Sequence, residues 1–232
     1  IGIGGSMGGQ QLLEWAIEEP ELFEYIVPLA TNANHSQWGI AFNESQRWAI
    51  EIDASWKERK DDAGTEGMKA ARSIALLSYR NYETYKSTKQ QDADSKDGAS
   101  YQRHQGDKLA KRFNAFSYWY LSKAMDSHDI SRGRGSVEAA LKKITAKALV
   151  IGISSDILFP ISEQELLAEH IPYSKFAVID SFYGHDGFLL EYETIGNLIT
   201  NFIAQSEEKK QQDYDSYYKL KNNMAKLRAF YL

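Results

Sequence analysis

The stretch Ile1-Gly2-Ile3-Gly4-Gly5-Ser6-Met7-Gly8-Gly9 decides the fold prediction for this chain of 232 residues. Its first residues are typical of the end of a buried strand, and apolar residues at helical spacing follow the glycines as far as Pro20. A serine flanked as Gly4-x-Ser6-x-Gly8 is the pattern of a strained strand-to-helix turn that exposes the serine hydroxyl. We therefore predict that Ser6 is a nucleophile. On this pattern alone, a glycine-rich turn with a passive serine stays open as the alternative.

A serine hydroxyl attacks a carbonyl only when a base removes its proton, and that base needs an acid to orient it. Asp156 follows the predicted strand 148–153, and His185 follows the next predicted strand, 176–179. The carboxyl ends of parallel strands meet at one edge of a sheet, so both loops are expected beside Ser6. We predict a catalytic triad of Ser6, Asp156 and His185. The alternative for Asp156 is that it only caps the turn that follows it.

The order of predicted elements indicates an α/β fold with a mostly parallel sheet and helices on both faces. We expect core segments at 1–42 and 136–205, the second of which carries the acid and histidine loops. The helical block 43–135 is predicted to be an inserted lid, and 206–232 a charged C-terminal tail. Within the block, helices are predicted over 68–85 and 109–125, with a polar surface loop over 86–107.

The amino-acid composition limits which binding partners and which cellular compartment we expect for this protein. The net charge is -5, with no concentrated basic stripe, so we expect no nucleic-acid partner. No segment approaches the roughly 20 unbroken apolar residues of a membrane span, so no membrane partner is expected. The chain contains no cysteine, which favours the cytoplasm, and its histidines lack metal-ligand spacing, so no metal site is expected.

Several longer motifs resemble one family, the homoserine O-acyltransferases of methionine biosynthesis, most often homoserine O-acetyltransferase. These enzymes are amino-acid acyltransferases of the α/β-hydrolase superfamily. The resemblance covers residues 1 to about 204 and rests on motifs that occur in the family's order. They are Gly4-Gly5-Ser6-Met7-Gly8-Gly9, Ala41-Phe42-Asn43-Glu44-Ser45-Gln46-Arg47, Ala71-Arg72-Ser73-Ile74-Ala75-Leu76-Leu77-Ser78-Tyr79-Arg80, Arg112-Phe113-Asn114-Ala115, His128-Asp129-Ile130-Ser131-Arg132-Gly133-Arg134-Gly135, Ser155-Asp156-Ile157-Leu158-Phe159-Pro160 and Tyr183-Gly184-His185-Asp186-Gly187-Phe188-Leu189.

The resemblance implies an α/β-hydrolase fold and ping-pong acyl transfer. An acetyl group would pass from acetyl-CoA to Ser6 and then to the hydroxyl of L-homoserine. No bound cofactor is implied, because the acyl-CoA is a co-substrate, and a homodimer is implied. Succinyl-CoA stays open as the donor, and a close analogue such as serine stays open as the acceptor.

The resemblance also implies roles for four further residues. The backbone N–H of Met7 would be one oxyanion donor. Arg72 and Tyr79 would bind the carboxylate of the amino acid, and Asp186 would bind its ammonium group. A guanidinium that pairs with a carboxylate and an aspartate that pairs with an ammonium would together fix a zwitterion.

The sequence departs from the family at its N-terminus. The family has a stretch before the serine turn that holds the first strands of the sheet and a loop with the second oxyanion donor. We find no counterpart, so those strands are expected to be absent and the chain is expected to be poorly stable and nearly inactive alone. Two other functions stay open: a serine hydrolase or esterase of the same fold, and an inactive fragment.

Overall fold

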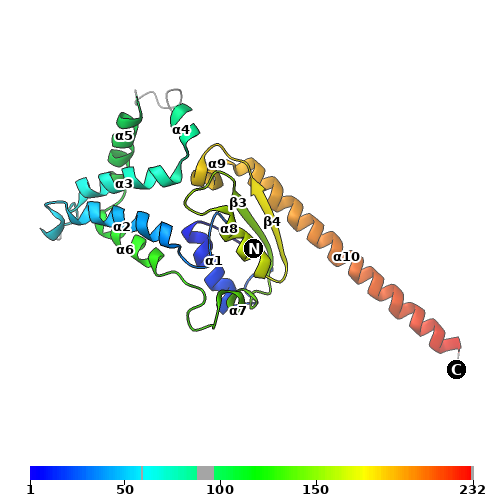
Figure 1. Ribbon diagram of the computed structural model, residues 1–232. Coiled ribbons are helices and arrows are strands. Elements are labelled where there is room, and N and C mark those ends of the chain that lie inside the picture. The colour runs from blue at the N-terminus through cyan, green and yellow to red at the C-terminus, as the bar shows by residue number, and fades with distance from the viewer. Residues whose placement is uncertain (59, 88–96, 231–232) are drawn as a thin grey trace. The chain divides into compact units, whose positions relative to one another are not determined.

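The computed structural model describes residues 1–58, 60–87 and 97–230, with side chains described as far as Ser216 in the last helix. The chain divides into two units, Ile1–Glu191 and Tyr192–Leu232. The first unit contains the sheet, and the second consists of helix α10 (Tyr192–Phe230) (Figure 1). Helix α10 begins after the short helix α9 (Gly187–Leu190), inside the predicted core segment 136–205, and continues into the predicted tail 206–232.

A parallel four-stranded sheet forms the centre of the first unit. Its strands occur in the order β1-β2-β3-β4. They are β1 (Gly2–Gly5), β2 (Tyr25–Leu29), β3 (Lys147–Ile153) and β4 (Ser174–Ile179). The register pairs Gly5 with Leu29 and Leu29 with Ile151, so the carboxyl ends of these strands lie side by side. Loops that leave those ends share one edge of the sheet, as the sequence predicts.

Three helices pack on one face of this sheet: α1 (Met7–Glu18), α7 (Val137–Leu141) and α8 (Ile161–His170). Leu13 of α1, Leu141 of α7 and Leu167 of α8 are fully buried in one apolar cluster with Ile26 and Val150 of the strands. Strand β3 is buried along nearly its whole length, which explains its continuous apolar sequence. This cluster fixes the strands that carry the predicted triad loops.

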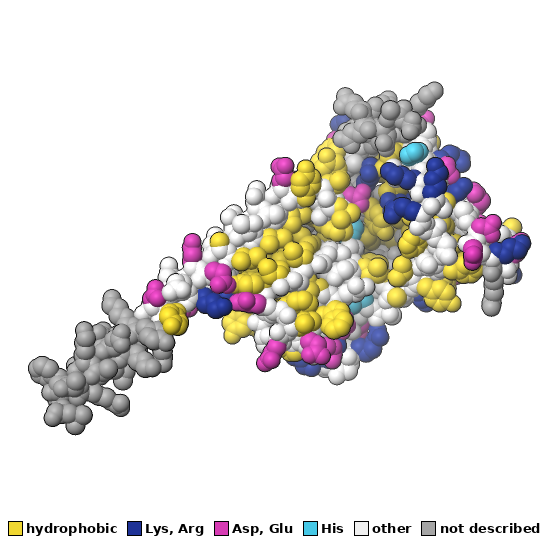
Figure 2. Space-filling model, turned by 180° about the vertical axis from the view of Figure 1, so that it is seen from behind, with side chains coloured by type: hydrophobic (Ala, Val, Ile, Leu, Met, Phe, Trp, Pro, Cys, Tyr) yellow, Lys and Arg dark blue, Asp and Glu magenta, His cyan; other side chains and the backbone are white. Residues whose placement is uncertain are grey.

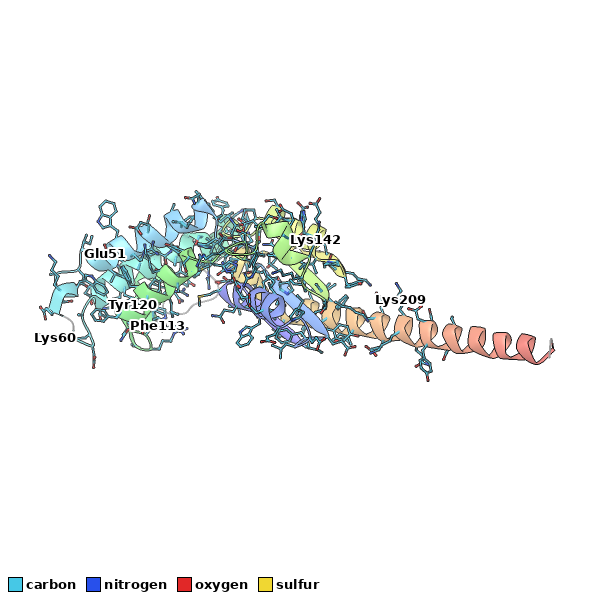
Figure 3. The ribbon with its side chains drawn as sticks, turned by 90° about the horizontal axis from the view of Figure 1, so that it is seen from below. Glu51, Lys60, Phe113, Tyr120, Lys142 and Lys209 are labelled. Carbon is cyan, nitrogen blue, oxygen red and sulfur yellow. The ribbon has the colours of Figure 1, made fainter. Side chains whose placement is uncertain are left out.

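A helical block follows β2 and precedes β3 (Figure 1). Its main helices are α2 (Gln37–Glu51), α3 (Thr65–Tyr79), α5 (Gly98–Ala110) and α6 (Ala115–Asp126), with the shorter η1 (Trp56–Glu58) and α4 (Tyr82–Ser87) between them. It has its own buried cluster, formed by Ile50, Met68, Ala71, Leu109 and Ala115. Glu51, Lys60 and Tyr120 mark one end of this block, well separated from Lys142 next to α7 (Figure 3).

Two predicted helices of the block are interrupted. The helix expected over 68–85 ends at Tyr79, and α4 begins at Tyr82 after Asn81, whose side chain accepts a hydrogen bond from the Thr84 amide at 2.9 Å. The helix expected over 109–125 begins at Ala115, because Asn114 caps it by accepting from the Ser117 amide. An asparagine side chain competes with a continuing helix in this way, and apolar spacing alone does not reveal such a break.

The surface loop predicted over 86–107 is also partly wrong. Helix α5 begins within it at Gly98, because Asp97 and Ser100 form a capping box in which each side chain binds the other residue's backbone amide. The part of the predicted loop at 88–96 lies outside the described residues. Among the helices that the structure does describe, none is both long enough and apolar enough to cross a membrane.

The serine turn itself yields a stability prediction. A Cβ added at Gly4 would lie 2.3 Å from the backbone oxygen of Gly8, whereas a Cβ at Gly8 would meet nothing within 4 Å. We expect Gly4→Ala to lower the free energy of unfolding by about 3 kcal/mol because backbone atoms must move. The matched Gly8→Ala variant lies in helix α1 and is expected to raise that free energy by up to about 1 kcal/mol. Denaturant unfolding of both variants checks this, and equal effects at the two positions would contradict it.

Candidate active site

Ser6 lies at the junction between β1 and α1, in a backbone conformation that few residues other than glycine adopt. Its φ is 54° and its ψ is -125°. The turn is held from β2, because the Ser6 amide donates to the Leu29 carbonyl at 2.9 Å and the Thr31 hydroxyl donates to the Ser6 carbonyl at 2.7 Å. Strain of this kind is typical of functional turns, and here the turn places the serine hydroxyl 2.9 Å from His185 Nε2.

The structure brings the three predicted triad residues into one hydrogen-bonded chain. His185 Nε2 lies 2.9 Å from Ser6 Oγ, and His185 Nδ1 lies 2.6 Å from Asp156 Oδ2. His185 and Asp156 are only 4% and 5% exposed. A buried carboxylate on Nδ1 holds the imidazole with its proton on that nitrogen, so Nε2 is free to accept the serine proton.

The acid and the base are each held by neighbours. Asp156 Oδ1 accepts hydrogen bonds from the backbone amides of Leu158 and Phe159, at 2.8 and 2.9 Å. The Phe159 ring stacks on the His185 ring with centroids 5.0 Å apart, and the Phe188 ring lies 5.2 Å away at an angle of 60°. The aspartate therefore cannot rotate without loss of two hydrogen bonds, and two aromatic rings pack against the imidazole.

Met7 is the first residue of α1 and directly follows the predicted nucleophile. Its backbone N–H is one of the first four of that helix, which have no carbonyl partner within the helix. Met7 and Ser6 line the same cavity. An amide in this place can donate to an oxygen that becomes negative when the serine attacks a carbonyl.

The residues predicted to bind the amino acid approach the triad from the helical block and from the histidine loop. The guanidinium carbon of Arg72 lies 5.4 Å from the centre of the Tyr79 ring, and the Tyr79 ring centre lies 5.8 Å from that of His185. Burial raises the pKa of the Tyr79 hydroxyl, and Arg72 partly opposes that rise, so Tyr79 stays a neutral hydrogen-bond donor. Asp186 follows His185 in the 3-10 turn Gly184–Asp186.

Sequence reasoning assigned no role to several residues at this site. Arg80 Nε donates to Asp186 Oδ2 at 3.2 Å. The sequence offers only one sign that Arg80 belongs to the site, which is its position directly after Tyr79. The Tyr118 hydroxyl donates to Gln46 Oε1 at 2.5 Å, and burial raises the pKa of that hydroxyl. Tyr118 and Gln46 lie on different helices, α6 and α2, and no spacing in the sequence could have paired them.

A cavity of about 350 Å³ opens at the triad serine. Its walls come from the serine turn and from the helical block, and include Ser6, Met7, Gln46, Tyr79, Phe113, Tyr118, Leu121, Met125 and Leu158. On the back of the molecule, basic side chains border a hollow in the surface (Figure 2). The cavity is large enough for a small acyl group and an amino acid, and it is mainly apolar apart from a few polar groups near the serine.

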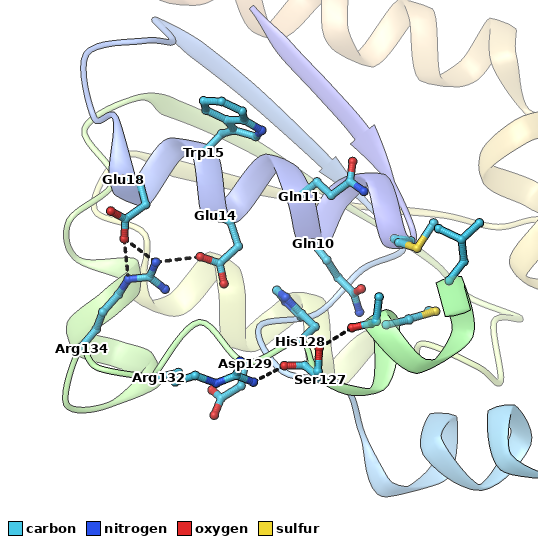
Figure 4. Close-up of a pocket in the computed structure, with 14 residues that line it drawn as sticks. Gln10, Gln11, Glu14, Trp15, Glu18, Ser127, His128, Asp129, Arg132 and Arg134 are labelled. Carbon is cyan, nitrogen blue, oxygen red and sulfur yellow. Dashed lines mark hydrogen bonds and ion pairs between the residues drawn. The ribbon is translucent and has the colours of Figure 1, made fainter. Parts of the chain in front are cut away.

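A second cavity, of about 680 Å³, lies beside α1 (Figure 4). Gln10 and Glu14 of α1 face the segment that carries Arg134, whose Nη2 lies 2.7 Å from Glu14 Oε2. Met7, Leu121 and Met125 line both cavities, so the two are neighbours. Ser6 lines the smaller cavity, whereas none of Ser6, Asp156 and His185 lines this second one.

Known proteins resemble this chain in sequence and in fold. A homoserine O-acetyltransferase from Cyclobacterium marinum is 46% identical over 207 residues, which cover 88% of this chain and 59% of that protein. Over 88% of its length the chain is homologous to this homoserine O-acetyltransferase. It spans about 59% of the length of that curated relative, and no family model matches it.

Solved structures support this relationship and the fold. A homoserine O-acetyltransferase from Staphylococcus aureus is 31% identical, with a TM-score of 0.73, over 87% of this chain and 57% of that one. An esterase, E22, has a TM-score of 0.77 at 20% identity over 86% of this chain and 60% of that one. At that identity it shows the fold alone. The chain has the α/β-hydrolase fold with an inserted helical block, as the sequence predicts.

Proposed function

We propose that this chain carries the catalytic serine, acid and base of an enzyme that acylates L-homoserine. In the first half-reaction Ser6 Oγ attacks the carbonyl carbon of acetyl-CoA while His185 Nε2 takes the serine proton. The C–S bond of the thioester then breaks, and the thiolate of CoA leaves with the proton held by His185. The acetyl group stays on Ser6 as an ester.

The second half-reaction reverses the proton path. The side-chain hydroxyl of homoserine gives its proton to His185 and attacks the ester carbonyl, and the bond to Ser6 Oγ breaks as Ser6 regains a proton. The backbone N–H of Met7 donates to the oxyanion in both steps, a contribution typically worth about 10²-fold or more in rate. The products are O-acetylhomoserine and the free enzyme, which gives ping-pong kinetics.

One observation carries this proposal: the chain of contacts from Ser6 through His185 to Asp156. The row from Arg72 through Tyr79 to His185, with Asp186 as the next residue, supports an amino acid as the acceptor. Arg72 and Tyr79 suit a carboxylate, and Asp186 suits an ammonium group. A simple esterase would need none of the three.

The test uses the complete gene product that contains these residues, because the relatives are longer than this chain. Thiol release is followed with acetyl-CoA or succinyl-CoA, with and without homoserine. We expect release that depends on homoserine and is faster with acetyl-CoA. Equal release without homoserine would favour a hydrolase, a preference for succinyl-CoA would change the donor, and no modification of Ser6 by a serine-directed phosphonate would indicate an inactive protein.

The acceptor site gives a second, more specific prediction. Arg72→Met is expected to raise the KM for homoserine by about tenfold to a hundredfold, because a charged hydrogen bond is typically worth about 1.5–3 kcal/mol. The burst of thiol from acetyl-CoA without acceptor should stay unchanged. Arg103→Met is the matched control, since Arg103 is an exposed arginine of the same helical block. An equal rise in KM for both variants would remove Arg72 from the site.

The proposal extends to a homodimer. Trp48, Ile52 and Tyr120 of the helical block are 68%, 73% and 67% exposed, and large apolar side chains left in water favour contact with a second copy. Sedimentation of the complete gene product tests this, with a monomer at micromolar concentration as the contradicting result. A cytoplasmic location stays a prediction.

A further inference from the structure

The segment that follows α3, residues 80–84, packs against the loop that carries the catalytic histidine. Helix α3 ends at Tyr79, and Arg80 adopts an extended backbone with φ -122° and ψ 154°, which turns its side chain off the helix axis. A Cβ at Gly184 would lie 3.0 Å from the Tyr79 carbonyl oxygen and 3.1 Å from Asn81 N. The two backbones are therefore in van der Waals contact, one residue before His185.

Hydrogen bonds reinforce this contact on both sides. The Thr84 hydroxyl donates to the carbonyl of Phe182 at 2.7 Å, three residues before the catalytic histidine. The Gly184 amide donates to Ser155 Oγ at 3.0 Å, which ties the same loop to the one that holds Asp156. The histidine loop is thus fixed between the helical block and the acid loop.

Arg80 makes the only charged contact of this junction within the described part of the chain. Its Nε lies 3.2 Å from Asp186 Oδ2, and the two side chains are 22% and 20% exposed. Its guanidinium carbon also lies 4.9 Å from the ring centre of Tyr101, which is buried in α5. The cation is therefore fixed by a ring on one side and by a carboxylate on the other, so its position is set before any substrate binds.

Arg80 binds only one of the two carboxylate oxygens of Asp186, so the other oxygen can accept from a ligand. Arg80 takes Oδ2, and no hydrogen bond among the described residues engages Asp186 Oδ1. A carboxylate can accept from a different cation at each of its oxygens. Asp186 directly follows His185 in the Gly184–Asp186 turn, so a carboxylate held in this way lies near the place where the proposed acceptor substrate must put its hydroxyl.

We propose that Arg80 is a positioning residue of the acceptor site, which fixes Asp186 so that Oδ1 receives the ammonium group of an α-amino acid. This inference rests on the proposed function. Arg80 acts through Asp186 and touches no reacting atom. Its loss therefore weakens discrimination in favour of acceptors that carry an amine, and leaves the chemistry of the triad intact.

The experiment compares two acceptors that differ only in the amine: homoserine and 4-hydroxybutyrate. In the complete gene product, Arg80→Met is expected to lower kcat/KM for homoserine by about tenfold, since hydrogen bonds to charged groups are typically worth this much. The value for 4-hydroxybutyrate should change by less than about twofold, because no ammonium contact is lost. Arg80→Lys should restore part of the preference, and Arg80→Met should add little to Asp186→Asn.

Several results would overturn the inference. An equal loss with both acceptors would show that Arg80 only supports the fold, and an unchanged or improved value for homoserine would show that Asp186 needs no positioning. The burst of thiol from acetyl-CoA serves as the check that each variant is folded and that its triad is intact. If the wild-type protein acylates neither acceptor, the proposed function fails. Calorimetric binding of the two compounds to wild type and to Arg80→Met then tests Arg80 alone, with equal losses for both as the contradicting result.

Discussion

Replacement of Ser6 by alanine is expected to lower the rate of acyl transfer by about 10⁶-fold, and the double variant with His185→Ala should be hardly slower. The two side chains act as a unit, because His185 Nε2 lies 2.9 Å from Ser6 Oγ and has no other proton to take in the first step. Once the hydroxyl is gone the base has nothing to activate, and once the base is gone the hydroxyl is a poor nucleophile. Their losses therefore overlap and do not add.

The measurement is single-turnover thiol release from acetyl-CoA, combined with mass detection of acetyl on the protein. The single variants Ser6→Ala and His185→Ala should each lose the acetyl adduct. Ser78→Ala is the matched control: Ser78 lines the same cavity, but its hydroxyl donates to the Ala75 carbonyl within α3. Additive losses in the double variant, or an acetyl adduct that survives Ser6→Ala, would assign the nucleophile elsewhere.

The sequence could predict that Ser6, Asp156 and His185 lie together, because each residue is tied to a local pattern. Ser6 lies in a glycine turn, and Asp156 and His185 each follow a strand whose apolar run is plain in the sequence. Parallel order then brings the three loops to one edge, so three local patterns were enough to place one long-range site.

Long-range polar contacts could not be predicted in this way. Arg80 and Asp186 are 106 residues apart, and Tyr118 and Gln46 are 72 apart. Their pairing depends on how the helical block packs, which apolar spacing does not determine. The helix breaks at Asn81 and Asn114, by contrast, depend on side chains that bind amides only three residues later in the chain. Such capping asparagines can be recognised in the sequence.

A second large effect is expected at the acid of the triad. Asp156→Asn keeps the size of the side chain and removes its charge, and we expect it to lower kcat by about 10⁴-fold. The surroundings of Asp156 explain why an amide cannot substitute. Oδ1 accepts from the Leu158 and Phe159 amides, so the asparagine must place its oxygen there, because an NH₂ group would face two donors.

The NH₂ group then takes the place of Oδ2, 2.6 Å from His185 Nδ1, and donates to that nitrogen. The imidazole must carry its proton on Nε2, which can no longer accept the proton of Ser6. Asp180→Asn is the matched control, because it also removes one negative charge near the site. Asp180 is exposed at the end of β4 and accepts a hydrogen bond from the Ser154 hydroxyl. Phosphonate labelling of Ser6 should slow as much as turnover does in Asp156→Asn and stay normal in the control. A rate within tenfold of wild type in Asp156→Asn would mean that Asp156 does not set the tautomer of the base.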